Sequence, residues 1–156
     1  MKTEKRFMGR AIMKALEGMK NGNSPFGSCV VKDGKVIAAA HNTVLTKKDA
    51  TNHAEMNAIR EACRKLRRHE LRGCTIYSTT EPCPMCFSAI HWAKIREIVY
   101  GTCTDDVEML GFGELTICDF ELKKRGRSGV RIRGGFMKKE CVELLALWKK
   151  KGGKTY

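Results

Sequence analysis

Four side chains in two short motifs could together bind a divalent metal ion and move a proton. His53 and Glu55 stand in a His-Ala-Glu triplet, and Cys83 and Cys86 stand in a Pro-Cys-Pro-Met-Cys segment. Thiolate and imidazole groups are common zinc ligands, and a catalytic zinc keeps three protein ligands and one open position for water. The motifs therefore predict a catalytic zinc ion held by His53, Cys83 and Cys86, with Glu55 left free as an acid/base group.

The spacing within each motif supports this interpretation. Cys83 and Cys86 are three residues apart, so both sulfur atoms lie on one face of a single helical turn. The free N–H groups and the dipole at a helix N-terminus favour the thiolate form. A general base such as Glu55 typically contributes about 10²–10⁴ in rate. The alternative, a structural zinc site, needs a fourth protein ligand, and the remaining histidines do not complete such a set.

The hydrophobic pattern places these motifs on a series of helices and strands. Apolar residues spaced by three and four predict helices, and short apolar runs between turn residues predict strands. The expected elements are a helix over 5–20, a hairpin of strands 28–32 and 35–40, a helix from about residue 53, a strand over 75–78, a helix from the cysteines to about residue 94, a strand over 97–101, a short helix within 105–119, a strand over 130–133 and a helix over 138–150. The close strand, helix and strand between residues 75 and 101 predict a parallel βαβ unit. The sum is an α/β fold, with a mixed sheet of about five strands and helices on both faces.

Length and composition indicate one globular domain, residues 1–156. Of the 156 residues, 42% are hydrophobic and 30% are charged, and no stretch is apolar enough for a membrane span or a signal peptide. Eight cysteines without a secretion signal favour a reducing cytoplasm. The formal net charge of +13 comes from basic clusters at 64–72, 123–133 and 138–151. Such clusters either attract phosphate-bearing partners, including RNA, or form a solvated surface.

The order of the two motifs, H-x-E followed by P-C-x-x-C, is the signature of zinc-dependent deaminases of nucleobases, nucleosides and nucleotides. The chain resembles this cytidine/deoxycytidylate deaminase superfamily. The stretch from Asn21 to Gly34 and the segments N-H-A-E, T-E-P-C-P-M-C and A-I-H-W are similar to its bacterial guanine deaminase branch. The resemblance implies the three-layer α/β/α cytidine-deaminase fold and a Zn²⁺ cofactor. It also implies a homodimer. Whether pocket residues cross between subunits, and whether the C-terminal segment is exchanged, is left open by the sequence.

The resemblance further implies a set of substrate contacts. Asn42 matches an asparagine that binds the purine, and Trp92 matches an aromatic residue that borders the pocket. Glu114 matches an acid that contacts the base and shuttles a proton, although this chain has Gly-Glu where the branch usually has Asp-Asp. Tyr156 matches a C-terminal tyrosine that covers the active site, and Phe26 is expected to line the pocket. Each of these side chains also has a simpler possible role in packing, in a turn or on the surface.

The expected reaction is the hydrolytic loss of an exocyclic amine from a purine base. Guanine would give xanthine and ammonia, and a nucleoside such as guanosine is a second small-molecule substrate. The alternative is a tRNA-specific adenosine deaminase, which acts on a flipped-out base, or a cytosine-type deaminase. The basic surface favours RNA, whereas Thr43-Val44 stand where the tRNA branch usually has Arg-Pro. An inactive RNA-binding or scaffold protein on this fold would have lost Glu55 or a cysteine, and neither is lost.

Overall fold

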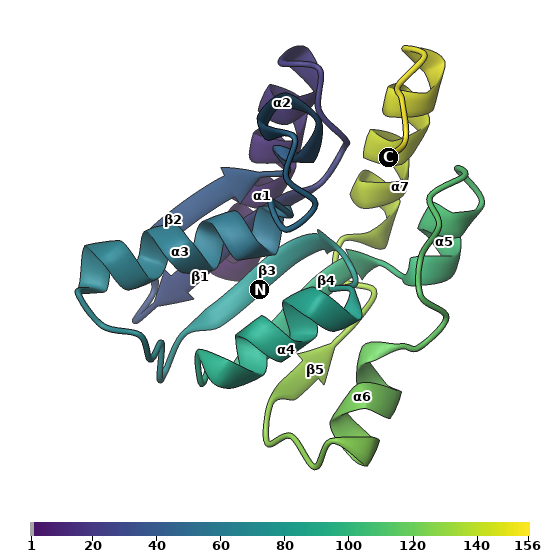
Figure 1. Ribbon diagram of the computed structural model, residues 1–156. Coiled ribbons are helices and arrows are strands. Elements are labelled where there is room, and N and C mark those ends of the chain that lie inside the picture. Colours follow the sequence, from purple (N-terminus) through teal and green to yellow (C-terminus); the bar gives the residue numbers. More distant parts are fainter. Residues whose placement is uncertain (1) are drawn as a thin grey trace.

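The central feature of the fold is a mixed sheet with the strand order β2-β1-β3-β4-β5 (Figure 1). The computed structural model describes the backbone of residues 2–156 and the side chains of residues 4–156. Strand β1 (Gly27–Lys32) pairs antiparallel with β2 (Lys35–His41) and β3 (Thr75–Thr80), while β4 (Glu97–Thr102) and β5 (Arg131–Arg133) run parallel to β3. The predicted parallel βαβ unit is therefore confirmed.

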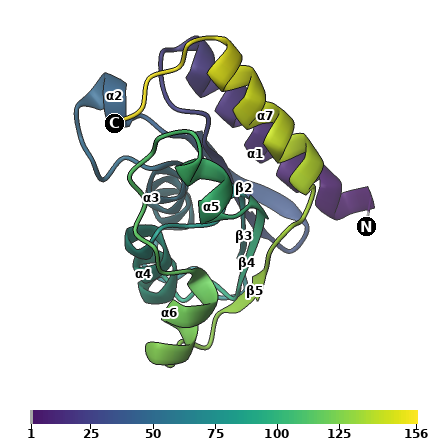
Figure 2. The same ribbon diagram turned by 90° about the vertical axis from the view of Figure 1, so that its right-hand side faces the viewer.

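Helices cover both faces of this sheet (Figure 2). Helices α1 (Lys2–Lys20) and α7 (Lys138–Lys150) lie side by side on one face, and α3 (Ala54–Leu66) and α4 (Pro84–Trp92) lie on the other. This arrangement confirms the expected three-layer α/β/α fold with five strands. None of the helices in residues 2–156 combines the length and apolar character that crossing a bilayer requires.

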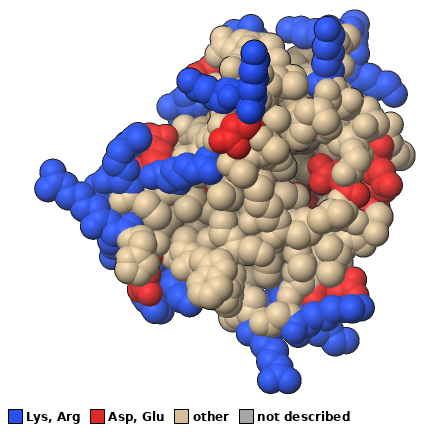
Figure 3. Space-filling view, in the orientation of Figure 1, with Lys and Arg blue, Asp and Glu red and all other residues tan. Residues whose placement is uncertain are grey.

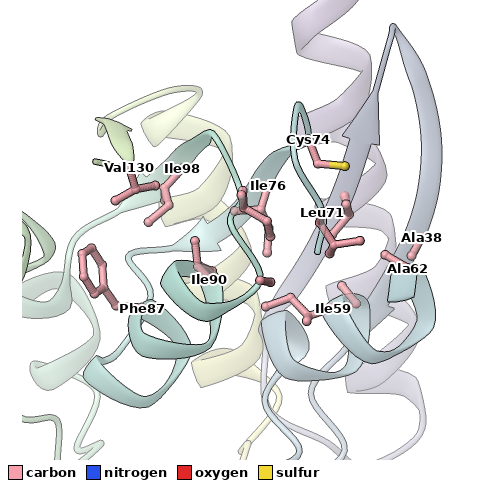
Figure 4. Packing of buried hydrophobic residues seen from close by; sticks show 14 of the residues in the cluster. Ala38, Ile59, Ala62, Leu71, Cys74, Ile76, Phe87, Ile90, Ile98 and Val130 are labelled. Atoms are coloured by element: carbon pink, nitrogen blue, oxygen red, sulfur yellow. The ribbon is translucent and has the colours of Figure 1, made fainter. Parts of the chain in front are cut away.

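Alternate residues of the central strands supply two separate cores. Ile76 and Ile98 are fully buried against α3 and α4, where they meet Ile59 and Ile90 (Figure 4). Their neighbours in the strands point to the opposite face, where Tyr77 joins a cluster with residues of α1 and α7. This alternation is the period of two that a β-strand imposes, and it explains why the central strands are apolar on both faces.

Glycine allows two features near the first hairpin. The turn residues Asp33 and Gly34 have φ angles of 47° and 71°, as the predicted two-residue turn requires. At Gly27 an added Cβ would lie 2.0 Å from the carbonyl oxygen of Ala11. Helix α1 therefore packs directly on the backbone of β1, just after Phe26.

The remaining elements differ from the expected ones mainly in two short helices. Predicted elements are present with ends shifted by up to three residues, and α5 (Thr104–Glu108) is the short helix expected within 105–119. Helices α2 (Val44–Lys47) and α6 (Asp119–Arg125) were not predicted. Two turns or fewer are too short to show a helical period. Helix α6 also lies in a basic run and adds only Leu122 to the larger core.

Candidate active site

Two helix N-termini bring the three expected metal ligands together. His53 is the N-cap of α3, Cys83 is the N-cap of α4, and Cys86 lies in the first turn of α4. Pro84 takes the first helical position, where its missing N–H costs nothing. The Nδ1 atom of His53 lies 3.6 Å from Sγ of Cys83 and 3.7 Å from Sγ of Cys86. The three ligand atoms all lie within 4.8 Å of one another.

These separations fit a tetrahedral zinc ion. Bonds of about 2.3 Å to sulfur and about 2.1 Å to nitrogen, at the tetrahedral angle, place sulfur and nitrogen about 3.6 Å apart. Within the part of the chain that the structure describes, the group contains His53, Cys83 and Cys86 without a fourth ligand. The donor set is therefore that of an open catalytic site rather than a closed structural one.

The pKa values of the two cysteines are shifted in opposite directions even without a metal ion. A hydrogen bond from Cys86, supported by His53, lowers the pKa of Cys83 to about 4. The same hydrogen bond, together with burial, raises the pKa of Cys86. Burial acts to lower the pKa of His53, but its hydrogen bond to Cys83 and nearby negative charges outweigh burial and raise it. Metal binding must therefore displace protons from Cys86 and from the imidazole.

Glu55 lies in the first turn of α3 with its carboxylate buried beside the metal ligands. Its Oε1 atom accepts a very short hydrogen bond from the hydroxyl of Ser78, and Cys86 Sγ lies 3.5 Å from Oε2. Burial raises the pKa of Glu55, while the bond from Ser78 opposes that shift. A raised pKa brings a carboxyl group closer to the pH at which a general base is most effective.

The C-terminal Tyr156 closes the pocket over these groups. Its hydroxyl accepts a hydrogen bond of 2.9 Å from Nδ2 of Asn42 and lies 3.3 Å from Nε2 of His53. Asn42 is fully buried, and its Oδ1 accepts a hydrogen bond of 3.0 Å from the amide of Val44, which fixes the orientation of the side chain. The structure thus brings Asn42 and Tyr156 to the metal site, and the tail reaches the pocket of its own chain.

Aromatic residues and one further acid form the rest of the pocket. Phe26 packs edge-on against Phe112 at 5.1 Å between ring centroids, and Phe112 in turn contacts Tyr156 at 5.6 Å. Glu114 is half-buried, and burial, together with the negative charge of Cys83, raises its pKa. The pocket is lined by Phe26, Asn42, His53, Glu55, Thr80, Glu81, Cys83, Glu114 and Tyr156.

Trp92 is the expected pocket residue that the structure does not bring to this site. It is the last residue of α4, whose nine residues begin just after Cys83, and its side chain is 72% exposed. Such a helix is about 13 Å long, so its two ends are well separated. The ring packs against His91 and Lys94 instead. The expectation that Trp92 borders the pocket is not met within this chain.

Other site residues were not singled out from the sequence. Ser78 and Thr80 lie at the end of β3 and share one face of the strand, as alternate residues do. Glu81 follows them and is 7% exposed. The available signal was their position: polar residues at the end of a buried strand, directly before the metal-binding Cys83.

The chain matches known proteins that share these motifs. The family of the cytidine and deoxycytidylate deaminase zinc-binding region matches residues 1–102. A guanine deaminase of Bacillus subtilis (strain 168) is 43% identical over 109 residues, which cover 69% of this chain and 70% of that protein. A tRNA-specific adenosine deaminase of the same organism is 32% identical over 146 residues, which cover 94% of this chain and 88% of that protein. The solved guanine deaminase from Nitrosomonas europaea has a TM-score of 0.85 at 27% identity, covering 92% of this chain and 83% of that chain.

The matched region contains all three metal ligands and Glu55. Its zinc-binding description agrees with the tetrahedral fit of His53, Cys83 and Cys86. The chain therefore belongs to the cytidine and deoxycytidylate deaminase family and is a zinc-dependent hydrolytic deaminase.

Proposed function

We propose that this deaminase acts on a free purine base and converts guanine and water to xanthine and ammonia. The observation that carries the proposal is the closure of the pocket by Tyr156, which is held by Asn42 next to the metal ligands. A pocket closed by the chain's own C-terminus suits a small free substrate better than a base attached to a polymer. Similarity to two guanine deaminases supports the same choice.

The pocket residues have distinct roles in this reaction. Zinc, when bound, lowers the pKa of a water molecule so that it can act as a nucleophile near neutral pH. Glu55 takes a proton from the attacking water and delivers it to the ring nitrogen beside the reacting carbon. The second proton of the same water then passes to the exocyclic amine with the help of Glu55 and Glu114, the bond between carbon and that nitrogen breaks, and ammonia leaves. Ser78 holds the carboxylate of Glu55 in place through its hydrogen bond.

Recognition of the base is assigned to Asn42, Phe26 and Glu114. The Nδ2 group of Asn42 now donates to Tyr156, and it is free to donate to an acceptor on the base edge when the tail moves. Phe26 offers an apolar face to the ring. Buried polar groups of this kind discriminate strongly against analogues that leave them unpaired.

A substrate panel tests the proposal directly. Zinc-loaded protein is mixed separately with guanine, guanosine, cytosine, adenosine and a tRNA, and ammonia release is measured. We expect guanine to be turned over with the largest kcat/KM. Turnover of tRNA or cytosine without turnover of guanine would refute the purine-base assignment.

Substitution of Tyr156 tests its role as the cover of the pocket. We expect Tyr156→Ala to lower kcat/KM for guanine roughly ten- to a hundredfold, because the pocket loses an aromatic cover and a hydrogen bond. Tyr156→Phe keeps the ring and loses only the hydroxyl, with its bond to Asn42 and its contact with His53, so its effect should be smaller. Lys154→Ala, an exposed neighbour in the tail, is the matched control. If Tyr156→Ala lowers KM and leaves kcat unchanged, the tyrosine obstructs the pocket rather than covering bound substrate.

A basic cleft favours tRNA-specific adenosine deamination as the second candidate function. The cleft has a volume of about 640 Å³, and its cationic lining residues are Arg72, Lys94, Arg96 and Arg131. Lys and Arg side chains also project over the C-terminal end of α3 and around α6 (Figure 3). Phosphate groups bind such surfaces in a salt-dependent way. However, the cleft lies at the C-terminal end of α4, whereas Cys83 lies at the N-terminal end of that helix. The tRNA sample of the substrate panel decides between the two functions.

We also propose a homodimer in a reducing compartment. Trp92 and Phe120 expose 72% and 54% of their surface, and large exposed apolar side chains often mark association surfaces. None of the eight cysteines, all of which lie in the described residues, forms a disulfide bond, and a reducing cytoplasm would keep them in that form. We expect light scattering to give twice the mass of the chain. An active monomer would contradict this prediction.

A further inference from the structure

One buried carboxylate, that of Glu81, holds both ends of the segment from residue 104 to residue 119. Its Oε2 atom accepts hydrogen bonds from the amide and the hydroxyl of Thr104, at 3.3 Å and 3.4 Å. Its Oε1 atom accepts a bond of 2.9 Å from the amide of Asp119. Thr104 is the first residue of α5 and Asp119 is the first residue of α6. The two ends of the segment therefore meet on a single side chain.

The segment between these ends carries pocket residues but has little regular structure of its own. After α5 it contains no strand or helix until α6 begins. Phe112 is buried against Phe26 and Tyr156, while Met109 and Leu115 are 76% and 65% exposed. The place of Glu114 in the pocket thus depends on the packing of Phe112 and on how the two ends are held.

Glu81 is itself rigidly joined to the metal site. Its amide donates a hydrogen bond of 2.8 Å to the carbonyl of Thr102 at the end of β4. Pro82 and the ligand Cys83 follow directly, and Glu81 is 7% exposed and lines the pocket. The backbone from which the Glu81 side chain projects is therefore anchored next to Cys83.

The carboxyl group of the neighbouring Asp119 does not repel the Glu81 carboxylate near pH 7. Its side chain is fully buried, and neither carboxyl oxygen has a hydrogen-bond partner among the described residues. Burial, with the charge of Glu81 adding to it, raises the pKa of Asp119 to about 9. Asp119 is therefore neutral near pH 7, and its amide can approach Glu81 without repulsion between two carboxylates.

We propose that Glu81 is a positioning residue that clasps both ends of segment 104–119 and thereby sets the place of Glu114 relative to the metal site. The clasp is defined by its bonds to Thr104 and Asp119. The catalytic consequence rests on the proposed role of Glu114, whereas the clasp itself does not depend on the substrate.

Two substitutions separate the clasp from the charge of Glu81. Glu81→Gln keeps the size of the side chain but turns an N–H₂ group toward one of the two backbone amides, so one end is released. Glu81→Asp keeps the charge but withdraws the carboxylate by one methylene, so it cannot reach both ends. Glu143→Gln, an exposed position on α7, is the control.

Hydrogen exchange measured on zinc-loaded protein reports the clasp without any substrate. We expect amide exchange in residues 104–119 to rise about tenfold or more in both variants, with α3 and α4 unchanged and zinc retained at one per chain. Unchanged exchange in this segment, or loss of zinc, would overturn the proposal. Wild-type-like exchange in Glu81→Asp alone would also overturn it. The negative charge at position 81, and not the length of the side chain, would then hold the segment.

A double-mutant cycle tests whether Glu81 acts through Glu114. On the substrate that the panel identifies, we expect Glu81→Gln and Glu81→Asp each to lower kcat/KM about tenfold, since small misplacements of active-site groups have effects of this size or larger. In a Glu114→Ala background the same changes should cost less than about twofold. A full tenfold loss in that background would mean that Glu81 acts independently of Glu114. Failure of guanine turnover in the wild type would refute only the substrate assignment.

Discussion

Glu55→Ala should lower kcat by about 10²–10⁴-fold or more, the usual contribution of a positioned general base, while zinc stays bound at one ion per chain. The three ligand atoms belong to His53, Cys83 and Cys86, so removing the Glu55 carboxylate leaves the metal site complete. What disappears is the group that transfers protons between the attacking water and the ring nitrogen. Activity is measured by ammonia release, and zinc by elemental analysis.

Two further variants make this test specific. Glu55→Gln retains an oxygen that can accept the hydrogen bond from Ser78, but it cannot carry the proton, so it should be as inactive as the alanine variant. Glu61→Gln, in the same helix and paired with Lys65 at the surface, should be fully active. A Glu55→Gln enzyme with wild-type kcat would remove the acid/base role from this residue.

Glu55 should not be needed for folding. Burial raises its pKa, which means that burying the charged form is unfavourable. A carboxyl group whose folded-state pKa is raised makes the protein less stable as the pH increases from the unfolded pKa through the folded one. We therefore expect Glu55→Ala to keep or raise the thermal unfolding temperature near pH 7, so that its lost activity cannot be attributed to unfolding.

The metal site was predictable from the sequence because its geometry is local. His53 and Cys83 each cap a helix, and Cys86 follows within one turn, so two short motifs specify all the ligand directions. The hairpin turn at Asp33-Gly34 was predictable for the same reason. Only the meeting of the two helix N-termini depends on the tertiary fold, and the zinc-ligand motif itself was what indicated it.

The rest of the site depends on contacts between distant parts of the chain. Asn42 meets Tyr156 across 114 positions, and Glu81 meets Asp119 across 38. Neither hydrogen bond leaves a periodic signal in the sequence. Tyr156 was anticipated only through the family resemblance, and Glu81 was not anticipated. Trp92 was likewise expected from the family resemblance, and within this chain it lies exposed at the far end of α4 from Cys83, so its place in a pocket stays a prediction.

Removal of zinc should abolish activity and destabilise the protein. The ion would join the N-termini of α3 and α4 through His53 and the two cysteines. Ligand binding at about 1,000 times Kd stabilises a fold by about 4 kcal/mol, which for a chain of this size corresponds to roughly 10 °C in Tm. We expect treatment with a chelator to lower Tm by about this amount, and one equivalent of zinc to restore both Tm and turnover.

The affinity for zinc should also fall as the pH falls. Both Cys86 and His53 have raised pKa values in the metal-free protein, and each must lose its proton to bind the ion. Each displaced proton weakens binding by up to about tenfold per pH unit below its pKa, so competition against a chromophoric chelator should show an apparent Kd that rises at least about a hundredfold from pH 8 to pH 6. Cys118→Ser, which changes an exposed cysteine outside the site, should leave both Kd and its pH dependence unchanged, whereas Cys86→Ser should weaken binding at every pH. A Kd that does not vary with pH would mean that neither proton is displaced and that His53 and Cys86 are not both ligands.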